Sequence, residues 1–411
     1  MGFNDLLLSV GGLGRFQIIH TTMLLIPMLF MGCHNFLQNF SAAVPAHRCW
    51  VPSLDNNTMG YDQDHLPAFI PMDESEKPLS CLRYRKALHS MWTNGTSTNH
   101  TEPCEDGWVY DKSDFSSTIV TEWDLVCKLR KMRQIAQSIY MAGVLVGAVL
   151  LGGLSDRLVP ESARWLILKG RSHEALKALQ RVAIINGKRE EGQKLSEMIL
   201  ISHMQSELNQ VKRPHSLFDL FRTPGMRKVT ICLMMVWFSS GVAFYGLGMD
   251  LQNFGISIFL LQFTFGAIDM PAKVVAALLM TYMGRRVTQA TVLILSGVAL
   301  LTNAFIPQGM KILRMVLAVF GKGCMAASFA CAYLFSGELF PTVIRQTGMG
   351  VVAMMARVGS VVAPLVLLLW EISPILPSAI YGIAAIIAGG AATFLMETNN
   401  QQLPESVEEV E

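Results

Sequence analysis

The sequence predicts an all-α, polytopic membrane protein with about eight transmembrane helices. Hydrophobic residues make up 51% of the 411 residues, charged residues only 16%, and the mean hydropathy is +0.38. Ordinary soluble domains carry about 25% charged residues, so this composition excludes a typical soluble domain. The apolar residues also gather in runs of roughly 20, the length that a helix needs to cross a bilayer. The net charge of +2, with no basic stripe, predicts no nucleic-acid partner.

Eight apolar runs have the length of a membrane span. The first contains Pro27, His34 and Asn35, is too long for the apolar core of a signal peptide and lacks a small-residue cleavage site. It therefore predicts a span rather than a cleaved leader. The expected spans are residues 16–40, 134–154, 229–249, 256–282, 289–305, 312–335, 347–370 and 376–396.

A long polar loop, about residues 41–133, separates the first two spans. It contains three clustered N-glycosylation patterns, at Asn56, Asn94 and Asn99. A fourth pattern at Asn39 lies close to the membrane. Three acceptor patterns in one loop indicate that this loop faces the outside of the cell.

The same loop contains four of the eight cysteines. An even number of cysteines in an oxidising compartment predicts two disulfides, with three possible pairings among Cys49, Cys81, Cys104 and Cys127. The other four lie in apolar runs and are expected to be packing residues rather than metal or redox sites. They are Cys33, Cys232, Cys324 and Cys331.

The segment between the second and third spans is rich in Lys and Arg, as cytoplasmic loops tend to be. With the long loop outside, this segment, the N-terminus and the acidic tail LPESVEEVE are expected inside, in a protein of the plasma membrane. The segment also predicts one amphipathic helix, for which Ser172 is the expected N-cap. Leu176, Leu179 and Val182 share one face of it, and Gly187 marks its end.

Two lone cations lie deep inside apolar runs, Lys273 and Arg357. A charge at bilayer depth costs at least about 2.5 kcal/mol, so such a residue faces a watery cavity or a partner. Arg357 has no acidic residue one turn away, and its guanidinium can hold a carboxylate or sulfate with two hydrogen bonds. The alternative is an ion pair with another helix, for example with Glu338. For Lys273 the alternative is an ion pair with Asp269, one helical turn before it.

Aromatic residues supply the surface that a flat organic anion needs beside a cation. Phe244 and Tyr245 follow each other in one apolar run, while Phe329 and Tyr333 share a helix face in another. The alternative for each is ordinary helix packing.

The sequence contains none of the motifs of enzyme chemistry. It has no glycine-rich phosphate loop after a strand, no spaced metal cluster and no nucleophile with an accompanying base. It therefore predicts no enzyme, no ATP-driven pump and no cofactor or metal.

Five segments together resemble the organic anion transporter subfamily of the solute carrier 22 family, within the major facilitator superfamily. They are MGFNDLLLSVGGLGRFQ, EPCEDGWVYDKSDFSSTIVTEWDLVC, PESARWL, the GRR turn and SGELFPTVIRQTGMG. The resemblance covers nearly the whole chain. It implies two six-helix halves that rock about a midplane site. It also implies exchange of amphipathic carboxylates or sulfate conjugates for a counter-anion.

The resemblance implies roles for individual residues. Arg357 and Lys273 match substrate-binding positions, the four aromatic residues match the cavity, and Asn35 and Met31 match positions near the pocket. Asn35 is as readily a helix–helix contact. Residues of the loop motifs are expected to latch helix ends and bias the transport cycle. They are Asp156, Arg157, Glu161, Arg164, Arg285, Arg286, Glu338 and Arg345.

One departure from the family pattern affects the whole fold. GGLSDR, residues 152–157, runs directly into PESARWL, whereas the family pattern places four spans between them. The third to sixth helices are therefore expected to be absent, leaving an incomplete major facilitator fold. The expected parts are residues 1–158 with two spans and the outer loop, a linker at 159–228, a six-helix half at 229–396 and a tail at 397–411.

Two functions remain open at this point. The chain either transports organic anions, or it is a transport-incompetent shortened form. Such a form would associate with the full-length transporter or with itself, or be retained in the endoplasmic reticulum.

Overall fold

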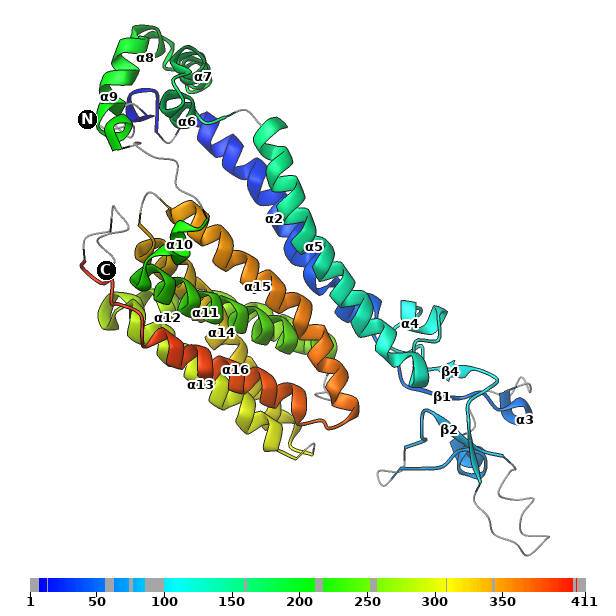
Figure 1. Ribbon diagram of the computed structural model, residues 1–411. Coiled ribbons are helices and arrows are strands. Elements are labelled where there is room, and N and C mark those ends of the chain that lie inside the picture. The colour runs from blue at the N-terminus through cyan, green and yellow to red at the C-terminus, as the bar shows by residue number, and fades with distance from the viewer. Residues whose placement is uncertain are drawn as a thin grey trace, which may run out of the picture.

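The computed structural model of the chain describes residues 7–12, 14–55, 63–73, 77–85, 100–158, 161–210, 217–251, 257–307, 309–341, 344–401 and 404. Figure 1 shows a bundle of helices, a pair of long helices beside it, and a smaller unit at each end of that pair.

Seven helical segments of the described residues are long and apolar enough to cross a membrane, and an eighth apolar helix has 17 residues. The eighth is slightly shorter than the predicted span because its helix ends at Ala392. The helices are α2 (Arg15–Ser41), α5 (Arg130–Leu158), α11 (Pro224–Met249), α12 (Ile258–Met283), α13 (Arg285–Phe305), α14 (Lys311–Leu339), α15 (Arg345–Leu367) and α16 (Leu376–Ala392).

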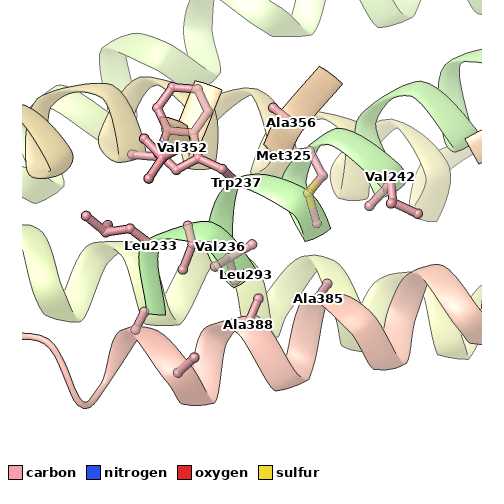
Figure 2. Packing of buried hydrophobic residues seen from close by; sticks show 14 of the residues in the cluster. Leu233, Val236, Trp237, Val242, Leu293, Met325, Val352, Ala356, Ala385 and Ala388 are labelled. Atoms are coloured by element: carbon pink, nitrogen blue, oxygen red, sulfur yellow. The ribbon is translucent and has the colours of Figure 1, made fainter. Parts of the chain in front are cut away.

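Helices α11 to α16 form a six-helix half with one continuous apolar core. Trp237 of α11 lies at its centre, and its indole nitrogen donates to the Ser336 hydroxyl of α14 at 2.9 Å. Figure 2 shows Trp237 among side chains of the neighbouring helices. Gly241 allows α11 to approach α15 closely, because a Cβ there would overlap the Ala356 backbone. This half therefore has the close packing that fixes its side chains in place.

Helices α2 and α5 contact each other near the end that carries the disulfide-bonded loop, where Gln38 Nε2 donates to the Arg133 carbonyl at 2.8 Å. Helix α5 packs against α15, and the Ser138 hydroxyl donates to the Val361 carbonyl at 3.1 Å. Helix α2 contacts α11 near its outer end only. None of the most apolar 18-residue window of α2 is buried, whereas 67% of the window of α11 is. Most of the apolar surface of helix α2 is therefore not covered by other parts of the protein.

The loop between α2 and α5 is not purely helical. It contains two small antiparallel sheets, β1 (His47–Cys49) with β4 (Trp108–Tyr110) and β2 (Leu82–Tyr84) with β3 (Thr101–Pro103). Short helices complete it: α3 (Pro52–Asp55), η1 (Gln63–Ala68), α4 (Ile119–Glu122) and η3 (Cys127–Leu129). The loop ends a few residues before the expected boundary, because α5 begins at Arg130.

Two disulfides cross-link this loop, as the sequence predicts. The pairs are Cys49–Cys104 and Cys81–Cys127. The other four cysteines are free. Of the glycosylation patterns, Asn56, Asn94 and Asn99 lie outside the described residues.

The fourth pattern, at Asn39, is a wrong expectation. Asn39 lies inside helix α2, where its amide nitrogen donates to the Gly248 carbonyl at 2.8 Å and to Gln262 Oε1 at 3.2 Å. An amide engaged between helices is not available as a glycan acceptor.

The segment after α5 folds into a helical linker unit of four helices rather than one. They are α6 (Ala163–Leu168), α7 (Ser172–Ile185), α8 (Arg189–Lys194) and α9 (Glu197–Gln210), and a short α10 (Asp219–Arg222) follows before α11. Ser172 is the first residue of α7 rather than its N-cap, which is Arg171. The fully buried positions of α7 include Ala175, Leu179 and Ala183, because α6 and α9 pack against this face. Leu176 and Val182 are only partly buried. The left-handed backbone of Gly187, with φ at +74°, marks the end of α7 as predicted.

Asn186 ties the linker unit to the start of helix α2. Its amide nitrogen donates to the carbonyl oxygens of Val10 and Gly11 at 3.1 and 3.0 Å, and its oxygen accepts from the Phe16 amide at 2.9 Å. The Val10 side chain is buried in the core of the linker unit. The linker unit and the first membrane helix are therefore directly joined.

Candidate functional site

A buried cation, Lys322 of α14, lies at the centre of the candidate site. Only 3% of its surface is exposed, and its Nζ lies 3.0 Å from the ring centre of Phe244 and 5.1 Å from that of Phe36. The same nitrogen donates to the Phe244 carbonyl at 3.2 Å. No ion pair found among the described residues involves Lys322. An aromatic face attracts a cation, but it does not neutralise its charge.

Sequence analysis missed Lys322, although the signal was present. Lys322 is a lone cation in an apolar run of the same kind as those of Lys273 and Arg357, with no acidic residue one turn away.

Aromatic rings extend from Lys322 across three helices. Phe244 contacts Tyr245 and Phe329 edge to face, with ring centres 5.4 and 5.3 Å apart. The ring of Phe36 of α2 stacks on Tyr245 at 6.1 Å. Trp237 continues the series, with Phe329 at 6.1 Å and Tyr333 at 4.5 Å. The structure therefore brings together all four aromatic residues selected from the sequence, and it adds Phe36 and Trp237.

Arg357 of α15 reaches the same cluster at Tyr245. Its guanidinium hydrogen-bonds to the Tyr245 hydroxyl. The half-buried side chain takes part in no ion pair found among the described residues. Glu338, the alternative partner considered above, pairs with Arg285 instead, at 3.1 Å. Among the described residues, Lys322 and Arg357 thus form no ion pair, and they contact the adjacent residues Phe244 and Tyr245.

Lys273 has different surroundings from Lys322 and Arg357. It is exposed on α12, and the described residues contain no ion pair between it and Asp269. Asp269 is partly buried, and its Oδ1 has no hydrogen-bond partner. The charges of both residues act on Lys322, which places the three near one another.

Asn35 and Met31, the two expected site residues of α2, have different surroundings. Asn35 is buried, accepts a hydrogen bond at its carbonyl from Gln137 at 3.5 Å, and lines a small hollow of about 20 Å³ with Gln38 and Arg133. Its Oδ1 is buried without a hydrogen-bond partner. Met31, one turn before Asn35 on the helix, is 38% exposed.

The motif residues Arg285, Arg286 and Glu338 are linked to one another or to Glu397 by one ion pair and by hydrogen bonds. Arg285 pairs with Glu338, while Glu397 accepts hydrogen bonds from the backbone amides of Arg285 and Arg286 at 2.8 and 3.0 Å. Glu397 thereby satisfies free amides at the start of α13, where a negative charge is favourable. Arg345 Nε donates to the Phe340 carbonyl at 3.2 Å.

The remaining motif residues lie towards the linker unit. Glu161 precedes α6, and Arg164 is exposed on it. Asp156 and Arg157 lie in the last turns of α5, with side chains outside the described part of the structure.

Known proteins similar to this chain are membrane transporters. A family model described as sugar (and other) transporter matches residues 157–409. Solute carrier family 22 member 6-B of Xenopus laevis is 40% identical over 524 aligned residues, which cover 100% of this chain and 95% of that protein. Solute carrier family 22 member 20 of Mus musculus is also 40% identical, with 100% and 94% covered. Organic anion transporter 3 of Oryctolagus cuniculus is 38% identical, again with 100% and 94% covered.

The length of these alignments bears on the fold. An alignment of 524 positions with a chain of 411 residues leaves at least 113 positions to which this chain contributes no residue. Among solved structures, the major facilitator superfamily proton:xylose symporter XylE is 17% identical with a TM-score of 0.44, covering 69% of this chain and 66% of that one.

Proposed function

The chain belongs to the solute carrier 22 family of membrane transporters, and on that basis we propose that it carries organic anions across the membrane. It is a multi-pass membrane protein and not an enzyme. The proposed location is the plasma membrane, with the disulfide-bonded loop outside and both termini in the cytoplasm. The relatives that carry the name organic anion transporter support the substrate class.

The observation that carries the proposal is a pair of cations, Lys322 and Arg357, that contact one aromatic surface and form no ion pair among the described residues. A buried ammonium without a carboxylate is costly, so the site is stabilised when an anion enters it. Arg357 can hold a carboxylate or sulfate through two parallel hydrogen bonds. Phe244, Tyr245 and Phe329 would contact the flat apolar body of the same molecule. The substrate class is therefore amphipathic carboxylates and sulfate conjugates.

The same charges favour exchange over one-way release. When the substrate leaves, Lys322 and Arg357 again lack a negative partner, so the empty site is less stable than the occupied one. A second anion that binds before the site reorients removes this cost. We therefore propose exchange with a counter-anion.

Uptake by variants at Arg357 tests the proposal. Arg357→Ala should lower saturable uptake of a labelled aromatic carboxylate by at least about tenfold, because a charge-assisted contact contributes about 1.5–3 kcal/mol. Arg357→Lys keeps the charge but loses the fork geometry, so it should retain part of the uptake. Lys311→Ala, at an exposed cation at the start of α14, is the matched control. Equal uptake per surface molecule in all four proteins would remove Arg357 from the mechanism.

Two observations favour a second function. This chain contributes no residue to at least 113 positions of the alignment with its relative, and one long face of α2 is not buried. An N-terminal part with two long helices leaves apolar surface that a complete half would cover. We propose as the alternative that the chain does not transport, and instead associates with the full-length transporter or with another copy, or is retained in the endoplasmic reticulum. Surface expression without uptake, or glycans that stay sensitive to endoglycosidase H, would favour this alternative.

A further inference from the structure

A basic cavity lies next to the disulfide-bonded loop, at the end of the membrane helices where this loop is attached. It has a volume of about 530 Å³, within the range of small-molecule sites, and lies between that loop and the first turns of α5. We call it the outer basic cavity. Its charged and titratable lining residues are His47, Lys128, Arg130, Lys131, Arg133 and Glu371.

The charge of the cavity is strongly one-sided. Four cations fall within six consecutive residues, and Glu371 is the only acidic residue among the lining residues. Glu371 pairs with Lys131, with Nζ and Oε2 3.1 Å apart. Burial lowers the pKa of His47, and the nearby charge of Arg130 acts in the same direction, so the imidazole is uncharged at neutral pH. Within the lining, four cations thus face one carboxylate, and the charge of Asp250, outside the lining, acts on Arg133.

Two general tendencies oppose cations at this position. The N-terminus of a helix has a positive partial charge, yet the first turn of α5 contains Arg130, Lys131 and Arg133 and no acidic residue. Lys and Arg also tend to gather on the cytoplasmic side of a membrane, whereas these residues lie on the side of the disulfides. The first placement costs free energy in the empty protein, and a bound anion would offset that cost.

The walls of the cavity are held in place by the fold. The Cys81–Cys127 disulfide forms part of the lining, and the guanidinium of Arg130 stacks over the Trp370 ring at 4.7 Å. Arg133, half-buried, also borders the small hollow lined by Asn35. The cavity is therefore preorganised, and it lies next to the small hollow beside Asn35, with which it shares Arg133.

From the cavity, its one-sided charge and its position we propose that it is a second anion-binding site, which takes small organic anions with two or more negative groups. Such a dianion would contact cations of both kinds in the lining, the two exposed lysines and the two partly buried arginines. Binding at this site does not depend on transport. Its role as a capture site that feeds the central site rests on the proposed function.

Equilibrium binding of labelled naphthalene disulfonate to the purified full chain tests the inference. The double variant Lys128→Gln/Lys131→Gln should weaken the outer component, by about two- to five-fold for each lysine, as expected for exposed charge pairs. Glu371→Gln removes the only carboxylate of the lining and should strengthen it by a similar factor. Lys112→Gln, at an exposed lysine of the same loop outside the cavity, should leave it unchanged. A merely structural role would not give opposite signs for the lysine and glutamate variants, and unchanged binding in both would overturn the inference.

Arg357→Ala separates this site from the central one. It should remove the central component of binding and leave the component that responds to Lys128, Lys131 and Glu371. If Arg357→Ala does not change binding while the variants at Lys128, Lys131 and Glu371 do, the proposal of the central site is contradicted and that of the outer site is supported. The reverse result overturns the outer site alone.

A footprint on the unmodified chain covers the case in which the variants do not fold. Naphthalene disulfonate should slow the reaction of an amine-directed reagent with Lys128 and Lys131 at least about two-fold, and leave Lys112 unaffected. Equal reaction rates with and without the dianion would overturn the inference.

Discussion

At the scale of single residues, the property that distinguishes the site is which cations form an ion pair within the protein and which do not. Arg285 has Glu338 and is neutralised within the protein, whereas Lys322 and Arg357 meet aromatic rings and a hydroxyl. The sequence could predict Arg357 and the four aromatic residues, because a lone charge and nearby rings in apolar runs are visible in one dimension. It could not choose between an anion and Glu338 as the partner of Arg357, since that choice depends on which helices face each other.

Lys322 gives a prediction in which stability and binding move in opposite directions. Lys322→Met keeps most of the side-chain volume and removes a buried charge, so the unfolding temperature should stay equal or rise. Anion binding should fall by at least about tenfold, because the charge-assisted contact is lost.

Both quantities are measurable on purified protein, by thermal unfolding and by equilibrium binding of an aromatic carboxylate. Lys311→Met is the control for a lysine-to-methionine change outside the site. A Lys322→Met protein that unfolds at a clearly lower temperature would instead identify Lys322 as a structural residue held by its aromatic neighbours.

At the scale of elements, the membrane helices could be predicted and the contacts between elements could not. Helix boundaries agree with the sequence to within a few residues for most spans, because a long apolar run leaves little choice. The disulfide pairing could not be predicted, since each bond joins cysteines 46 or 55 residues apart through the fold of the loop. Of the four helices of the linker unit, the sequence predicts only α7. Helices α6 and α8 have only six residues each, too few to show a helical period in the sequence.

The joint between the linker unit and α2 gives an element-scale prediction. Asn186→Ala removes the acceptor of the Phe16 amide and the donor to two carbonyls, each loss costing about 1–3 kcal/mol where the group stays buried. Hydrogen exchange of residues 7–17 should therefore become at least about tenfold faster, as measured by mass spectrometry on the full chain.

Lys188→Ala, at an exposed residue of the same unit, should leave that exchange unchanged. If Asn186→Ala also leaves exchange unchanged, the linker unit is held to the N-terminal segment by the packing of Val10 rather than by Asn186.

At the scale of the whole molecule, the chain combines a well-packed six-helix half with an N-terminal part of two membrane helices. The core of the six-helix half is continuous, whereas α2 has almost no buried surface. The sequence predicts this imbalance from the direct junction of GGLSDR and PESARWL, and this stays a prediction. The cations and rings of the proposed central site come largely from the six-helix half.

The central claim is that this chain carries organic anions through the Lys322–Arg357 site. Its most direct test is uptake of a labelled aromatic carboxylate by cells that express this chain alone, normalised to surface-biotinylated protein. The account predicts saturable uptake above that of control cells, reduced by an excess of unlabelled anion and lost in Arg357→Ala. No uptake despite surface expression would contradict it, and would identify the chain as a form that keeps an anion site without a complete pathway.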